Sequence, residues 1–151
     1  RPKSVLMSSL TLEEFVPYRL SVASNAVSTR ISQSYRKRFK LKVAEWRLIA
    51  ILAETARMTP QDIGKAGELD KITVSRAASA LLKRGLVAQD RNPEDGRSHF
   101  LSLTAEGKAL YEQIVPAAKG MEEALLAKFS AEDRARLVSL LRQIEDAANS
   151  T

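Results

Sequence analysis

The chain has 151 residues, a formal net charge of +6 and a sequence pI of about 9.8. This length suits one domain or one compact unit with a dimerisation extension, and the positive charge favours an anionic partner. The sequence has no cysteine and one histidine, His99, which excludes disulfides and thiolate sites, argues against a zinc site, and predicts no metal and no cofactor. No apolar run approaches the roughly 18 residues of a membrane span and no signal peptide is visible, so we expect a cytoplasmic protein without a membrane partner.

Hydroxyl residues mark the starts of three predicted helices. Thr11, Thr59 and Ser130 each precede a carboxylate by three residues, the pattern of a helix N-cap, and Pro60 occupies the favoured first position. Pro17 lies too deep for a helix that starts at Thr11, so we expect a short turn there. The predicted elements are helices at about 17–39, 43–55, 60–66 and 71–84, strands near 86–91 and 98–103, a helix from 104 to about 128 with a kink at Pro116, and a helix at about 131–148.

The last predicted helix carries an apolar stripe at a spacing of three to four residues, formed by Leu137, Leu140, Leu141, Ile144 and Ala148. The first long helix has an apolar stripe of its own. The small central part of the chain cannot bury both stripes. We therefore expect a second copy to cover them in a twofold homodimer.

The predicted helix from Lys71 separates apolar from polar residues. Its inner face holds Val74, Ala77, Ala78, Leu81 and Leu82. The outer face has hydroxyls and cations, and no carboxylate follows Asp70; it consists of Ile72, Ser75, Arg76, Ser79 and Lys83, with Lys71 and Thr73 near the start. Ile72 suits contact with a thymine methyl, and Arg76 suits a guanine or a phosphate. These seven residues are candidate DNA contacts; an ordinary solvated face is the alternative.

Two helix starts have predicted roles of their own. Asp70 is interpreted as an N-cap rather than a DNA contact, because phosphate repels a carboxylate. Thr59 and Gln61 are candidate phosphate donors at a helix N-terminus, where free amides favour an anion. A cap with no further role is the alternative for Thr59.

The polar stretch from Asn92 to Ser98 reads as the tip of a hairpin, or wing. Arg97 is a candidate for insertion into the DNA minor groove, Ser98 is a further candidate contact, and Asp95 would pair with Arg97 or fix the loop. A solvated turn is the alternative. His99 is interpreted as a strand residue facing solvent or a phosphate, since no nucleophile or metal partner accompanies it.

Several motifs together resemble the MarR family of transcriptional regulators. They are Glu45-Trp-Arg47, Leu69-Asp-Lys-Ile-Thr-Val-Ser-Arg76, Arg84-Gly-Leu-Val87, Asp95-Gly-Arg97, and Leu101-Ser-Leu-Thr104 with Gly107. The stretch Ala78-Ser79-Ala80-Leu81 departs from the charged middle often seen in that family, which puts only peripheral contacts in doubt.

The resemblance implies a mainly α fold with a small β-wing: a winged helix-turn-helix with N- and C-terminal dimerisation helices. The single chain of residues 1–151 would then hold a DNA-binding lobe at 43–103 and dimerisation helices at 10–42 and 104–150. It also implies a homodimer on a pseudo-palindromic operator in double-stranded DNA, usually a repressor, released by a small molecule that binds between the lobes.

Charged side chains on the first helix suggest an effector site. Arg19 and Arg30 fall inside its apolar stripe, where an unpaired guanidinium is costly. In the family that the motifs resemble, the ligand cavity lies where this helix meets the second helix and the dimer interface. The resemblance therefore implies that Arg19 and Arg30 bind an anionic aromatic effector, with Tyr18 and Trp46 lining the pocket. The alternatives are an Arg19–glutamate pair across the dimer and a core role for Trp46.

Two further segments bear on the effector. Residues 15–20 resemble the branch of the family that senses hydroxycinnamates and hydroxycinnamoyl-CoA thioesters. The basic stretch 35–40 fits a coenzyme A phosphate, the DNA backbone or a solvated helix end.

The expected function is a sequence-specific DNA-binding regulator, a repressor released by an aromatic acid or its CoA thioester. The alternatives are an effector-independent architectural DNA-binding protein and a protein-interaction module on a helix-turn-helix scaffold. We do not expect an enzyme, because the sequence offers no nucleophile–base pair or metal set.

Overall fold

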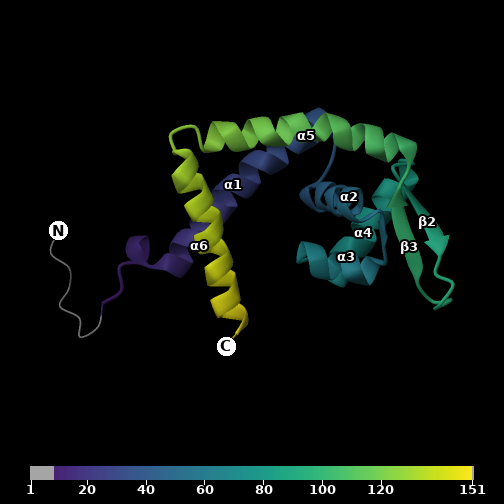
Figure 1. Ribbon diagram of the computed structural model, residues 1–151, viewed down its shortest axis with the longest axis horizontal. Helices are drawn as coiled ribbons and strands as arrows, with labels where there is room; N and C mark the ends of the chain where they lie inside the picture. Colours follow the sequence, from purple (N-terminus) through teal and green to yellow (C-terminus); the bar gives the residue numbers. More distant parts are fainter. Residues whose placement is uncertain (1–8, 151) are drawn as a thin grey trace. The chain divides into compact units, whose positions relative to one another are not determined.

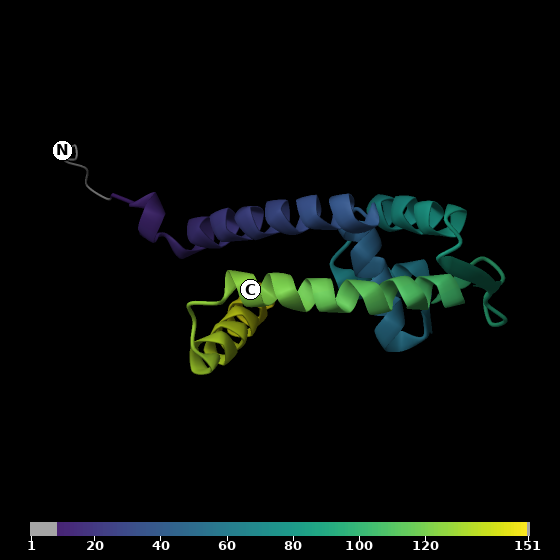
Figure 2. The same ribbon diagram turned by 90° about the horizontal axis from the view of Figure 1, so that it is seen from above.

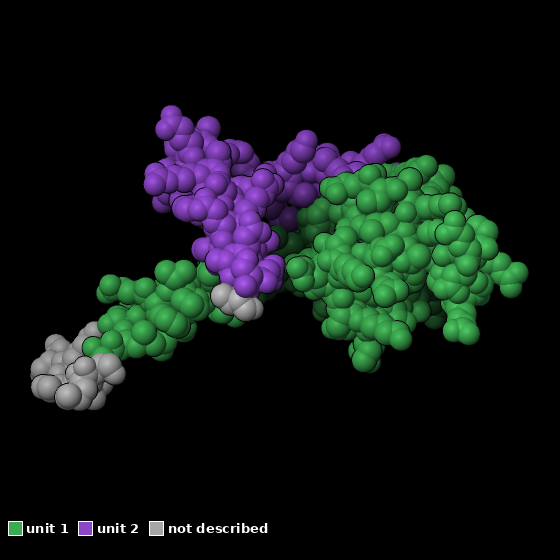
Figure 3. Space-filling model, turned by 60° about the horizontal axis from the view of Figure 1, so that its bottom comes forward, with its two compact units in different colours: residues 1–108 green, residues 109–151 purple. Residues whose placement is uncertain are grey.

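The computed structural model describes residues 9–150, and these are mainly helical with a small antiparallel sheet (Figure 1). The chain divides into two units, residues 1–108 and residues 109–151, coloured green and purple in Figure 3. The elements are η1 (Leu12–Glu14), α1 (Val16–Phe39), α2 (Val43–Thr55), β1 (Arg57–Met58), α3 (Pro60–Gly67), α4 (Lys71–Lys83), β2 (Val87–Arg91), β3 (His99–Leu103), α5 (Ala105–Leu125) and α6 (Ala131–Asn149).

The helix-turn-helix begins and ends where local chemistry dictates. The Thr59 hydroxyl accepts a hydrogen bond from the Asp62 N–H at 3.1 Å, and Pro60 opens α3. Asp70 caps α4 in the same way, so both predicted N-caps are confirmed. Glu68 ends α3 in the left-handed conformation, with φ of 54°, and this turn directs the chain into α4.

Three antiparallel strands form the wing sheet in the order β1-β3-β2. Val87 pairs with Leu103 at its base and Arg91 pairs with His99 next to its tip. The two-residue strand β1 was not predicted; Arg57 pairs with Ser102, and its guanidinium lies 4.2 Å from the centre of the Phe100 ring. Such a cation–π contact helps hold this short edge strand on β3.

The core of the first unit lies where α2 packs against α3, α4 and β3. The predicted inner face of α4 is confirmed, since Val74, Ala77, Ala78 and Leu81 are buried and Leu82 is half-buried. The other buried side chains of this core include Leu48, Ile49, Leu52, Ile63 and Leu101.

Helix α1 joins this core only through its C-terminal turns. Residues 21–30 are all exposed, whereas Tyr35 has 2% of its surface exposed and packs with its ring centre 5.1 Å from that of Trp46. The rest of the helix extends away from the core of the first unit (Figures 1 and 2). Val16 and Val22 of this helix, and Phe15 at its N-cap, are exposed in the single chain.

The second unit contains most of α5 together with α6. Helix α5 continues through Pro116 and ends at Leu125, slightly earlier than predicted. Arg134 organises the turn into α6: it pairs with Glu123 at 2.8 Å and donates to the carbonyls of Leu126 and Phe129. The apolar stripe of α6 is exposed in the single chain at Leu137, Leu140, Leu141 and Ile144. No helix within residues 9–150 has the length and apolar character needed to cross a membrane.

Candidate nucleic-acid interface

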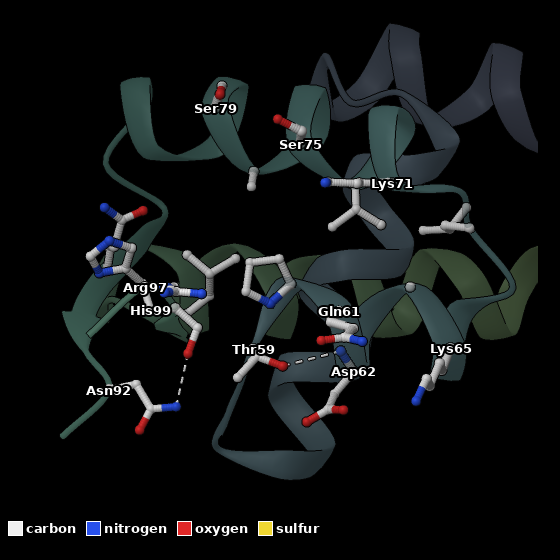
Figure 4. A pocket seen from close by; sticks show the side chains of 18 of the residues that line it. Thr59, Gln61, Asp62, Lys65, Lys71, Ser75, Ser79, Asn92, Arg97 and His99 are labelled. Carbon is white, nitrogen blue, oxygen red and sulfur yellow. Dashed lines mark hydrogen bonds between the residues drawn. The ribbon is translucent and has the colours of Figure 1, made fainter. Parts of the chain in front are cut away.

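A groove of about 980 Å³ lies between the start of α3, one side of α4 and the wing. Figure 4 shows its walls, with Lys71, Ser75 and Ser79 from α4, Gln61 and Lys65 from α3 and Thr59 from its N-cap, and Asn92, Arg97 and His99 from the wing. Lys65, Lys71 and Arg97 contribute positive charge, whereas Asp62 and Asp95 also line the groove. The three cations outnumber the two acids, so the groove favours an anionic occupant.

Six of the seven predicted DNA-contact residues of α4 fall into two groups. Lys71, Ser75 and Ser79 line the groove. Ile72, Arg76 and Lys83 are exposed along a neighbouring crest that the groove does not include, and Ile72 has 64% of its surface exposed. A crest beside a groove is the shape that lets a helix enter a major groove while one phosphate backbone runs alongside it.

Asp70 and Thr73 are occupied with each other at the start of α4. The Asp70 carboxylate accepts hydrogen bonds from the Thr73 N–H at 2.7 Å and from the Thr73 hydroxyl at 2.9 Å. The backbone bond from Thr73, followed by the hydroxyl bond, lowers the pKa of Asp70 below its ordinary value. The Thr73 hydroxyl hydrogen is thus used within the cap, which leaves the oxygen of that side chain to accept from a ligand.

The wing tip is fixed by its own polar side chains. The Asn92 amide donates to the Ser98 hydroxyl at 2.9 Å, and the Glu94 N–H donates to Asn92 Oδ1 at 3.0 Å. Asp95 Oδ1 accepts from the backbone N–H of Arg97 at 3.0 Å. Of the two predicted roles of Asp95, the structure supports fixing the loop. The role of Asn92 was not predicted, although an asparagine before a proline is a known signal of such a turn.

The Arg97 side chain is free to meet a ligand. Within residues 9–150 the ion pair between Arg134 and Glu123 is the only one, so no carboxylate pairs with the Arg97 guanidinium. His99 is exposed and lines the same groove, consistent with its predicted orientation toward solvent or a phosphate. No group of His, Cys, Asp and Glu within these residues could hold a metal ion.

The predicted effector residues do not converge within one chain. Tyr18, Arg19 and Arg30 are exposed along α1, whereas Trp46 is half-buried beside Tyr35 at the other end of that helix. At a rise of about 1.5 Å per residue, Arg19 lies about 24 Å from Tyr35 along the axis. A single copy therefore has no pocket formed by these four side chains. A pocket that contains both Trp46 and Arg19 would need a second copy of the chain, and it stays a prediction.

The cations of α1 nevertheless form an unusual charge distribution. From Phe15 to Ala44 the sequence has seven Lys and Arg residues and no Asp or Glu. The basic end of the helix, with Arg36, Lys37 and Arg38 exposed, complements the partial negative charge of its C-terminus. Arg19 and Arg30 lie too far from that end for this explanation to apply to them.

The exposed crest of α4, its flanking groove and the fixed wing together define a winged helix-turn-helix DNA-binding protein. A sequence model of the MarR family matches residues 39–98. The "HTH-type transcriptional regulator FarR" of Neisseria gonorrhoeae is 32% identical over 116 residues, which cover 70% of this chain and 75% of that protein. The "Homoprotocatechuate degradative operon repressor" of Escherichia coli is 29% identical, with 76% of this chain and 77% of the repressor covered. The chain belongs to the MarR family of transcriptional regulators.

Solved structures agree with this assignment. A MarR/EmrR family regulator from Acinetobacter sp. ADP1 is 25% identical and superposes with a TM-score of 0.85, covering 94% of this chain and 100% of its own. Bordetella bronchiseptica BpsR, whose DNA binding is regulated by 6-hydroxynicotinic acid, is 27% identical with a TM-score of 0.84 and coverages of 92% and 99%. A MarR mutant from E. coli complexed with operator DNA is 25% identical with a TM-score of 0.79 and coverages of 91% and 99%. MarR family regulators bind DNA as dimers and are not enzymes.

Proposed function

We propose that this protein is a repressor that binds a pseudo-palindromic operator as a homodimer and leaves it when a small anionic aromatic effector binds. The observation that carries the DNA-binding part is the carboxylate-free outer side of α4, which stands exposed beside a groove of net positive charge. Thr59 and Gln61 at the start of α3 and Arg97 and Ser98 on the wing would contact the DNA on either side of that helix.

The exposed apolar faces support the homodimer. Phe15 at the N-cap of α1, Val16 and Val22 within it, and the apolar stripe of α6 each leave apolar surface uncovered in a single chain. A second copy related by a twofold axis would cover both kinds of face and place two α4 helices about 34 Å apart, one turn of B-DNA. Leu141→Asp is expected to give a monomer in sedimentation velocity, whereas Ser139→Asp, on the opposite side of α6, keeps the dimer.

The DNA-binding part is tested by selecting duplexes from a random library and measuring the affinity for the selected sequence by fluorescence anisotropy. We expect a palindromic site bound about 10³-fold or more tightly than a scrambled duplex. The affinity should also fall steeply with salt, because bound phosphates release their counterions. Equal affinity for both duplexes would favour an architectural protein instead. Absence of binding at low salt would favour a protein-interaction module.

The effector part rests on the unbalanced cations of α1 and on two relatives. Arg19 and Arg30 lie on the face that dimerisation would cover, where a guanidinium needs an anionic partner. One relative is named for an operon that degrades homoprotocatechuate and another responds to 6-hydroxynicotinic acid, and both compounds are aromatic acids. The effector must bind the DNA-incompetent arrangement more tightly than the competent one, because equal affinity shifts no population.

Calorimetry with a panel of aromatic acids tests this part. The panel includes benzoates, hydroxycinnamates and hydroxycinnamoyl-CoA thioesters, so that the acid and the thioester branches are separated. Arg19→Ala is expected to lose binding of whichever compound the wild type binds, whereas Arg142→Ala, an exposed α6 variant with the same charge change, keeps it. Retained binding by Arg19→Ala would contradict the role of Arg19.

A further inference from the structure

One side chain ties the end of α4 to the end of α1. Arg84, the residue that follows α4, donates from Nη1 to the carbonyl of Lys40 at 3.1 Å and from Nη2 to the carbonyl of Phe39 at 3.3 Å. Carbonyls at a helix C-terminus lack partners within the helix and carry partial negative charge, so a guanidinium fork suits them. In the part of the chain that the structure describes, no other side-chain hydrogen bond connects α1 or its cap to another helix.

The remaining attachment of α1 is short. The N–H of Lys40 and the N–H of Leu41 donate back to the carbonyls of Arg36 and Tyr35, and this closes the last turn of the helix. Tyr35 and Leu41 are buried in the core, whereas the helix is exposed from residue 21 to residue 30. Lys40 adopts the left-handed conformation with φ of 56°, so the chain changes direction sharply here. The turn between α1 and α2 is therefore the place about which α1 would pivot.

The length of α1 makes this pivot sensitive. At about 1.5 Å per residue the helix is about 36 Å long, so a rotation of about 5° about its last turn moves its first turn by about 3 Å. This displacement is close to the rise of one base pair, about 3.4 Å. In a dimer held together through α1, such a movement would change the distance between the two α4 helices by a comparable amount.

We propose that Arg84 is a positioning residue that fixes α4 to the end of α1 and thereby sets the half-site spacing that the dimer accepts. The proposal rests on the proposed function, an operator-binding homodimer. Arg84 acts through the backbone of Phe39 and Lys40 and not by touching DNA. It lies at the base of the wing, while the tip lies at the other end of strands about 13 Å long.

The experiment compares operators that share both half-sites and differ only in the spacer between them. Affinities are measured by anisotropy for the selected operator, for versions with one base pair added or removed, and for a single half-site. The wild type is expected to discriminate against altered spacing. Arg84→Ala should reduce this discrimination by about threefold to thirtyfold, the range typical of residues that couple two sites, with half-site affinity unchanged. Arg84→Lys should lose it as well, because an ammonium cannot span two carbonyls as the guanidinium fork does.

The outcomes separate this inference from the proposed function. Arg142→Ala serves as the control for charge loss and should keep the wild-type spacing preference. Unchanged half-site affinity establishes that the Arg84 variants are folded. If Arg84→Ala or Arg84→Lys discriminated between operator spacings as strongly as the wild type, the positioning role would be overturned while the proposed function stands. Failure of the wild type to bind any palindromic duplex would overturn the proposed function, and this inference with it.

Discussion

The Thr104 hydroxyl donates a hydrogen bond of 2.6 Å to the carbonyl of Gly85. The same oxygen accepts from the N–H of Gly107 at 3.1 Å, and the Thr104 N–H donates to the carbonyl of Leu86 at 3.1 Å. One residue therefore joins the turn after α4, the base of the wing and the first turn of α5. The base of the wing is held by these bonds independently of the polar network at its tip.

Replacing Thr104 by valine removes both hydroxyl bonds and keeps the shape of the side chain. We expect Thr104→Val to lower the free energy of unfolding by about 1–2 kcal/mol, the usual size of a lost N-cap together with a lost hydrogen bond. Urea denaturation measures the change, and Thr104→Ser, which keeps the hydroxyl, should stay close to the wild type. Identical midpoints for the valine variant and the wild type would show that these bonds contribute nothing.

Gly107 is required for a different reason, since the backbone comes too close for a side chain. A Cβ placed there would collide with the carbonyl of Leu86, and a backbone atom cannot move aside cheaply. Gly107→Ala is expected to cost about 1–3 kcal/mol of stability, as overpacked sites do. Gly120→Ala is the matched control, because nothing lies within 4 Å of a Cβ at that helical position, and alanine there should be neutral or stabilising. Equal stability of the two variants would contradict the close approach.

The cap of α4 predicts a pH dependence. The hydrogen bonds from Thr73 lower the pKa of Asp70 in the folded chain, so the folded state holds the ionised carboxylate more readily than the unfolded state does. The resulting stability is present above the ordinary carboxyl pKa of 3.8 and is lost as the pH falls below it through the lowered folded value. Urea midpoints measured between neutral pH and pH 3 should therefore fall less steeply for Asp70→Asn than for the wild type. Parallel curves would argue against the cap as a source of acid sensitivity.

The features that the sequence predicted are those that local chemistry controls. Asp70 and Ser130 cap helices within three residues of themselves, so α4 and α6 begin where their sequences indicate. Strand β1 escaped prediction because two residues carry no periodicity and their pairing depends on the distant β3. The Arg84 fork escaped it for the same reason, since it reaches residues 44 and 45 positions away along the chain.

Only some parts of the candidate site could be predicted from the sequence. The outer face of α4 follows from helical geometry, whereas the groove beside it depends on α3 and the wing and could not be predicted. The network at the wing tip depends on the hydrogen bond that the Asn92 amide donates to the Ser98 hydroxyl. No periodic pattern in the sequence encodes this bond. Arg19 and Arg30 share one helical stripe, but spacing along a helix says nothing about what faces that stripe, and one chain leaves it exposed.

Arg97 gives the sharpest test of how the wing contacts DNA. Asp95 engages the backbone of Arg97 and leaves its guanidinium exposed, so the side chain can enter a minor groove without first breaking an ion pair. Because narrow minor grooves concentrate negative potential, Arg97→Ala should weaken binding most where A-tracts flank the half-sites. We expect a loss of about tenfold or more there and a smaller loss with G·C flanks. Anisotropy titrations on two operators with identical half-sites and different flanks measure the difference, and Arg142→Ala controls for the lost charge. An equal loss on both operators would reduce Arg97 to a general phosphate contact, because a bond to the backbone depends little on groove width.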